Sequence, residues 1–171
     1  MEFSEVLRKR HSIRSFKSHP LEKEKIQAIL EAANSAPSAG NLQAYEIYLV
    51  EDGEMRQKLA QAAWGQHFIS QAPIVLVFCA HPGRSSIKYG RRGTELYSVQ
   101  DATIAASYAN LTAIDLGLAS CWVGAFDEEE VRKCLDLSSS LRPIILMPIG
   151  YAEEHGFHTS RRSLSDLVHY K

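Results

Sequence analysis

Residues 74–80, Ile-Val-Leu-Val-Phe-Cys-Ala, form an unbroken apolar run. A strand with one face in water alternates apolar and polar side chains, and this segment does not alternate. Such a run therefore predicts a strand buried on both faces. We expect it to lie at the centre of a sheet that helices cover on both sides.

Several flanking segments have the periodicity of helices or strands. In the segment after Leu21, the residues Ile26, Ile29, Leu30 and Ala33 have the i, i+3, i+4, i+7 spacing of an amphipathic helix. Further helices are expected at 3–10, after Gly53 in the segment that contains Met55 and Ala63, and at 97–116. Asp127, followed by Glu130 three residues later, is an N-cap signature and predicts a helix at 127–135. Further strands are expected at 45–50, 118–123 and 143–151. The polar stretch 81–94, rich in Gly, Lys and Arg, is expected to be a connecting loop and a lid. Helices and strands alternate too irregularly for a doubly wound parallel sheet.

The expected helix at 97–116 is rich in Ala and apolar around most of its circumference, and Gly117 suits the position after its end. A helix of this kind must be enclosed by other structure. Two arrangements satisfy this requirement: the helix is central to the core of its own chain, or a second subunit covers part of it.

Length and charge limit the classes of partner. A chain of 171 residues normally forms one domain, here residues 1–171, and needs no disulfide or structural metal to fold. A net charge of −1 argues against nucleic acid or an anionic membrane as partner. Three cysteines without a CxxC pair, no leader-like N-terminus and no membrane-length apolar run indicate a cytoplasmic protein whose cysteines pack as small hydrophobes.

Several well-known catalytic motifs are missing. The chain has no GxxxxGK[ST] phosphate loop, no GxGxxG turn, no HExxH zinc motif and no GxSxG elbow. His155 and His158 have no third ligand nearby in the sequence, so we expect both to be solvated and expect no metal site. The sequence therefore contains no positive signal for hydrolytic catalysis.

Three clusters of polar residues are candidates for ligand binding. The first contains Arg10, His11, Ser12 and Arg14, whose guanidinium and hydroxyl groups suit a phosphate. The second is the loop 37–43, whose small residues and amides allow close approach of a planar polar ligand, and the third is the pair Arg161–Arg162. Taken singly, each also fits a plain feature: a solvated basic turn, an ordinary turn and a solvated tail.

Together these clusters resemble a known family. Arg10–Phe16 (Arg-His-Ser-Ile-Arg-Ser-Phe) and Ala36–Gln43 (Ala-Pro-Ser-Ala-Gly-Asn-Leu-Gln) are similar to the opening of the FMN-dependent nitroreductases. The segment Asp101–Phe126, the tetrapeptide Pro148–Tyr151 and the closing Arg161–Val168 follow the family's order and spacing. The resemblance extends over nearly the whole chain, which is short for the family.

The resemblance implies an α+β fold: a nitroreductase-like three-layer sandwich with a central, mostly antiparallel sheet flanked by helices, in an intertwined homodimer. Two FMN sites would lie at the subunit interface, each built from both chains. The phosphate would be held by Arg10, Ser12 and Arg161 with a local contribution from His11, and Arg14 would reach the pyrimidine edge of the flavin. The partner chain would supply Pro37, Ser38 and Asn41, backbone groups of Val123 and Gly124 would face the hydride-accepting nitrogen, and Gln43 and Gln66 are further candidates.

The same resemblance implies a ping-pong oxidoreductase. NADH or NADPH would reduce the flavin, and a small oxidant such as a nitroaromatic or a quinone would then take the electrons. No catalytic side chain is needed, because the cofactor carries the chemistry. Alternatives are other chemistry on the same fold, such as reduced-flavin fragmentation or reductive dehalogenation, and a non-enzymatic module that binds anions or nucleic acid through its arginines.

Overall fold

The computed structural model describes residues 1–157 and 159–171. Its strands are β1 (Tyr45–Val50), β2 (Ile74–Ala80), β3 (Ala119–Ser120) and β4 (Arg142–Gly150). Its helices are α1 (Phe3–Lys9), α2 (Lys23–Asn34), η1 (Ala39–Asn41), α3 (Gly53–Ala62), α4 (Phe68–Gln71), α5 (Pro82–Arg92), η2 (Gly93–Tyr97), α6 (Ser98–Asp115), α7 (Glu128–Cys134) and α8 (Leu164–Leu167). His158, one of the two tail histidines considered above, lies outside the described residues.

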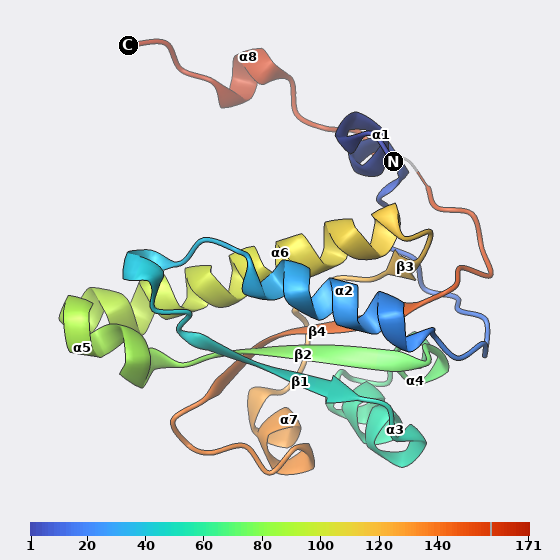
Figure 1. Cartoon of the computed structure of the whole chain (residues 1–171), viewed down its shortest axis with the longest axis horizontal. Helices are drawn as coiled ribbons and strands as arrows, with labels where there is room; N and C mark the ends of the chain where they lie inside the picture. The colour runs from blue at the N-terminus through green and yellow to red at the C-terminus, as the bar shows by residue number, and fades with distance from the viewer. Residues whose placement is uncertain (158) are drawn as a thin grey trace.

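The strands form one antiparallel sheet in the order β1-β2-β4-β3. Helices α2 and α6 cover one face of the sheet, and α3, α4 and α7 lie on the other (Figure 1). The α+β three-layer class expected from the resemblance is confirmed.

Strand β2 is the centre of the structure, and all seven of its residues are buried. Its side chains point alternately to the two layers: Leu76 and Phe78 pack in the cluster with α2 and α6, whereas Val75 and Val77 pack in the cluster with α3 and α7. Each such side chain contributes about 1.5–3 kcal/mol relative to an exposed one. The prediction of a central strand covered on both sides is therefore confirmed.

Helix α6 lies against α2 and the sheet, as the core arrangement requires. Ala102, Ala105, Ala106, Ala109 and Ala113 are completely buried along one stripe of the helix. Small side chains allow the helix to approach the sheet closely, which explains the alanine content. The opposite side of α6 remains partly open.

The segment 81–94 is not the loop that its composition predicts, because most of it is helical. Pro82 occupies the first turn, and the His81 side chain accepts a hydrogen bond from the Arg84 backbone N–H at 3.3 Å. Gly90, with φ 53° and ψ −137°, then breaks the helix before the π-helical turn η2. Pro82 and the His81 cap therefore start a helix in a segment whose glycines and charges suggested a loop.

The expected strand 118–123 is shorter than predicted. Only Ala119–Ser120 pair as a strand with β4, and Val123 rejoins it through an isolated bridge to Leu146.

Among residues 1–157 and 159–171, the structure has no helix with the length and hydrophobicity of a membrane span.

Asp127 is the predicted N-cap of α7, and its Oδ1 accepts hydrogen bonds from the backbone N–H groups of Glu129 and Glu130 at 2.9 and 3.0 Å. We expect Asp127→Ala to lower the free energy of unfolding by about 1 kcal/mol, because two helix-terminal donors lose their acceptor. Asp127→Asn keeps an acceptor and serves as the control. Urea unfolding measures both, and equal losses in the two variants would contradict this capping role.

Candidate functional site

The segment after α1 is extended and is attached to the edge of the sheet. The N–H of Ile13 donates to the carbonyl of Ser120 at 3.0 Å, and the N–H of Lys17 donates to the carbonyl of Tyr151 at 2.9 Å. The Ile13 side chain is buried in a small cluster with Ala119. In extended backbone successive side chains alternate in direction, so Arg10, Ser12 and Arg14 face away from Ile13.

These residues line a cavity of about 420 Å³. The tail contributes Arg161 to the same cavity, although Arg161 is separated from Arg14 by most of the chain. Of the predicted residues, the cavity brings together Arg10, His11, Ser12, Arg14 and Arg161, and its other lining residues are Leu7, Arg8, Phe157 and Thr159. Our sequence reasoning missed Arg8, although its spacing of two from Arg10 was a usable signal.

The guanidinium groups in this cavity are free to bind an anion. Arg10, Arg14 and Arg161 form no ion pair with any carboxylate of residues 1–157 and 159–171. The Arg14 guanidinium lies over the Phe68 ring, 5.9 Å from its centroid, and its own backbone N–H donates to Glu154 at 2.6 Å. Within the part of the chain that the structure describes, Arg161 donates to its neighbours Thr159 and Ser160 and to no other residue.

Cys121 is buried, and the charges of Arg14 and Arg10 act on its thiol. Burial raises the pKa of its thiol, and the positive charges of Arg14 and Arg10 only partly oppose that shift. Burial likewise raises the pKa of the Cys79 thiol to about 12. Both cysteines therefore remain protonated near neutral pH, which fits packing and not nucleophilic catalysis.

Arg162, which follows Arg161 in the sequence, does not point into the same cavity. Its Nε donates to Asp166 Oδ2 at 2.5 Å, within the tail itself. Among the described residues, Arg162 is therefore held by a carboxylate and does not line the cavity with Arg161.

The second predicted cluster, Pro37 to Gln43, forms a compact turn around η1. Ser38 Oγ accepts a hydrogen bond from the Gln43 N–H at 3.0 Å, and Gln43 Nε2 donates to the Asn41 carbonyl at 2.9 Å. Asn41 and Gln43 have positive φ values of 57° and 42°, which L-residues seldom adopt. The turn is therefore held in a specific conformation by its own side chains.

Asp101 of α6 binds this turn through its side chain. Asp101 is 2% exposed, and its carboxylate accepts hydrogen bonds from the N–H of Ala39 at 2.9 Å and of Ala44 at 3.3 Å. One side chain thus fixes both ends of the η1 turn. Our sequence analysis took Asp101 only as the start of a motif, because this link between segments exists only in three dimensions.

The third predicted segment contains Val123 and Gly124. Both backbone groups of Val123 are used by Leu146: Val123 N–H donates at 3.0 Å and Val123 C=O accepts at 2.9 Å. Gly124 is exposed, and a Cβ added there would meet no atom within 4 Å. Gln66 Nε2 donates to the Ala125 carbonyl at 2.9 Å, so Gln66 braces this loop.

The two parts of the predicted cofactor site, residues 10–14 and residues 37–43, lie on opposite sides of the folded chain (Figure 1). The turn between α2 and β1 is beside α5, at the left in Figure 1, whereas the segment after α1 runs along the right. The predicted FMN-binding residues therefore do not converge in one chain.

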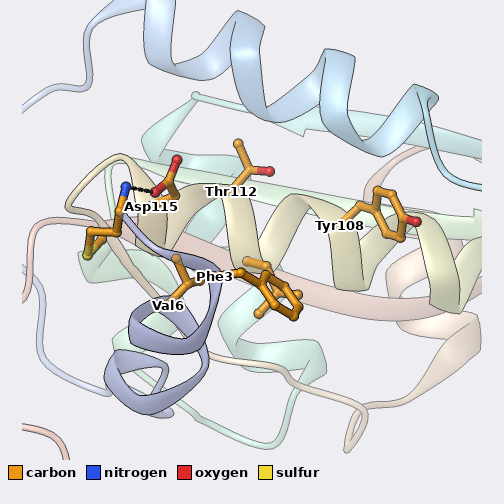
Figure 2. Close-up of a pocket in the computed structure, with 7 residues that line it drawn as sticks. Phe3, Val6, Tyr108, Thr112 and Asp115 are labelled. Atoms are coloured by element: carbon orange, nitrogen blue, oxygen red, sulfur yellow. Dashed lines mark hydrogen bonds and ion pairs between the residues drawn. The ribbon is translucent and has the colours of Figure 1, made fainter.

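A groove of about 430 Å³ lies between α1 and α6. Figure 2 shows Phe3 and Val6 of α1 beside the α6 face that carries Tyr108 and Thr112, with the N-terminal ammonium group paired to Asp115. Phe3 is 65% exposed and Tyr108 41% exposed. This chain therefore leaves an apolar surface open along its central helix.

The chain is an α+β protein with an arginine-lined cavity, and comparison with known proteins identifies its family. The Nitroreductase family model matches residues 7–68 and 62–151. The chain is 32% identical to an NADH dehydrogenase of Thermus thermophilus, over 94% of this chain and 91% of that protein. This protein belongs to the nitroreductase family, as the resemblance predicted.

Solved structures agree with this assignment. Bacillus megaterium NfrA2 superposes with a TM-score of 0.91 at 28% identity, over 99% of this chain and 74% of that one. An FMN-dependent nitroreductase of Clostridium difficile superposes with a TM-score of 0.79 at 32% identity, over 96% of each chain.

Asp101→Asn tests the attachment of the η1 turn. We expect faster hydrogen exchange at the amides of Ala39 and Ala44, by about tenfold, because one of the two charge-assisted acceptors is lost. Asp115→Asn, an exposed position on the same helix, is the matched control and should leave these amides unchanged. Equal exchange in both variants and the wild type would show that Asp101 does not hold the turn.

Proposed function

We propose that this protein is an FMN-dependent oxidoreductase that takes electrons from NADH or NADPH and passes them to a small oxidant such as a nitroaromatic or a quinone. The observation that carries the proposal is the cavity in which Arg10, Ser12, Arg14 and Arg161 meet. Its donors fit FMN, since free guanidinium groups and a hydroxyl suit a phosphate dianion. The names of relatives, an NADH dehydrogenase and an FMN-dependent nitroreductase, support the same function.

Each half of the site has its own task in this proposal. Arg10, Ser12 and Arg161, with His11 alongside, bind the phosphate, and Arg14 binds the pyrimidine edge of the flavin ring. Pro37, Ser38, Asn41 and Gln43 of a second chain border the ring, and the segment Val123–Gly124 faces its reactive edge. The open backbone at Gly124 supports this last assignment, because a side chain there would occupy the approach.

The functional unit in this proposal is a homodimer with two shared sites. Two observations support it: the candidate residues lie on opposite sides of one folded chain (Figure 1), and the groove beside α6 exposes apolar side chains. The tail with α8 extends away from the body of the chain in Figure 1, and its residues Leu164 and Tyr170 are exposed, which suits packing against a partner. A second chain would cover these surfaces and complete each site.

When bound, FMN supplies the acceptance and release of a hydride. The chain binds and orients it, and a positive charge at Arg14 favours added electron density on the pyrimidine edge. The reductant and the oxidant occupy the same space in turn, which gives ping-pong kinetics. No protein nucleophile takes part, in keeping with the protonated state of Cys79 and Cys121.

The absorbance spectrum of the purified protein tests the proposal directly. We expect flavin bands, present as purified or after incubation with FMN, that bleach on anaerobic addition of NADH or NADPH and return when a nitroaromatic is added. A colourless protein that gains no flavin and instead binds nucleic acid with steep salt dependence would overturn the proposal.

Arg161→Ala and Arg14→Ala test the two proposed contacts. Loss of one charge-assisted contact should weaken FMN binding at least tenfold, measured by fluorescence titration of the apoprotein. Arg14→Ala should also slow flavin reduction, since the charge on the ring edge is lost. Arg162→Ala removes the neighbouring charge and is the control for Arg161; equal FMN affinity in both tail variants would exclude Arg161 from the site.

A further inference from the structure

The segment 81–97, which comprises α5 and η2, has a strong positive charge in a chain whose net charge is −1. It contains four basic residues, Arg84, Lys88, Arg91 and Arg92, and a single carboxylate, Glu95. Two of the basic residues have partners. Arg84 donates to the Leu42 carbonyl at 3.2 and 3.1 Å, and Arg91 pairs with Glu95 at 2.7 Å.

The other two basic residues lie over tyrosine rings. Lys88 Nζ is 5.4 Å from the ring centroid of Tyr89, and Arg92 Cζ is 5.3 Å from that of Tyr97. The two rings contact each other edge to face, with centroids 5.0 Å apart. Lys88, Tyr89, Arg92 and Tyr97 therefore form one connected group, called here the cation–tyrosine cluster.

The charges of this cluster are not neutralised. Lys88 and Arg92 are exposed and pair with no carboxylate in the described part of the chain, residues 1–157 and 159–171. Arg92 Nε donates to the Tyr97 hydroxyl at 2.9 Å, which fixes the plane of the guanidinium and leaves its other N–H groups to a ligand.

The cluster borders the η1 turn. A Cβ built at Gly40 would stand 2.5 Å from the Tyr89 hydroxyl and 2.9 Å from Lys88 Nζ, so both groups lie directly against the backbone of Gly40. Gly40 has a φ of 58° and lies between Ser38 and Asn41, two proposed flavin contacts. An anion bound by the cluster would therefore lie beside the cofactor site and not within it.

We infer that the cation–tyrosine cluster binds a phosphate group of the adenosine half of the reduced nicotinamide dinucleotide. This inference rests on the proposed function, because it places the reductant beside the flavin. A phosphate is the part of NADH or NADPH that unpaired Lys and Arg side chains recognise. The 2′-phosphate is present only in NADPH, whereas the pyrophosphate is common to both, so the two sources are distinguishable.

Calorimetric titration with adenosine 2′,5′-bisphosphate tests binding without turnover. Lys88→Ala and Arg92→Ala should each weaken binding about tenfold, because one charge-assisted contact is lost. Arg91→Ala is the control, because it removes from α5 a positive charge that Glu95 of η2 already neutralises. We expect this variant to bind the nucleotide like the wild type. Equal weakening in all three variants would mean that the nucleotide responds only to the summed positive charge of residues 81–97 and not to a specific site, and this result would overturn the inference.

Steady-state kinetics supply the second readout. In the Lys88 and Arg92 variants, KM should rise while kcat stays unchanged, because binding energy is lost equally in ground and transition states. A rise for NADPH alone assigns the 2′-phosphate, a rise for both nucleotides assigns the pyrophosphate, and unchanged KM values overturn the inference. If the wild type holds no flavin, or if NADH and NADPH leave its flavin oxidised, then the proposed function itself has failed.

Discussion

Burial of β2 on both faces is the constraint on which the rest of this structure depends. A strand with no polar side chain can be stable only between two apolar layers, so α2 and α6 must cover one side and α3 and α7 the other. Strand β2 also occupies the middle of the sheet, between β1 and β4. Functional segments are consequently displaced to the edges and ends of the sheet, where backbone groups and polar side chains remain accessible.

The candidate site is built at these edges by two different devices. At one edge, an extended segment buries Ile13 on one side and places Arg10, Ser12 and Arg14 on the other. The same extended backbone therefore attaches the segment to the core and directs the candidate binding groups into the cavity. At the other end, the buried carboxylate of Asp101 holds the η1 turn through two N–H groups. The first device is local in sequence, and the second joins segments that are more than fifty residues apart.

The sequence predicted most of the regular elements because their signals are local. The amphipathic spacing around Ile29, the cap at Asp127 and the apolar run of β2 each fall within one element, and the structure has a helix, a cap and a central strand there. Residues 81–94 were mispredicted because Gly90 and the charges suggested a loop. Its first turn is nevertheless stabilised by Pro82 and His81, and Gly90 breaks the helix only after two turns.

The sequence by itself determined the fold class, the family and the identity of the phosphate-binding candidates, since periodicity and motif order can be read directly along the chain. Only the tertiary structure showed that Arg161 shares a cavity with Arg10, that Arg162 is paired with Asp166 instead, and that Asp101 holds the η1 turn. The reason is physical: a side chain's role in a site depends on which distant groups neutralise its charge or accept its hydrogen bonds. Packing of the whole chain decides those neighbours, and spacing in the sequence does not record them.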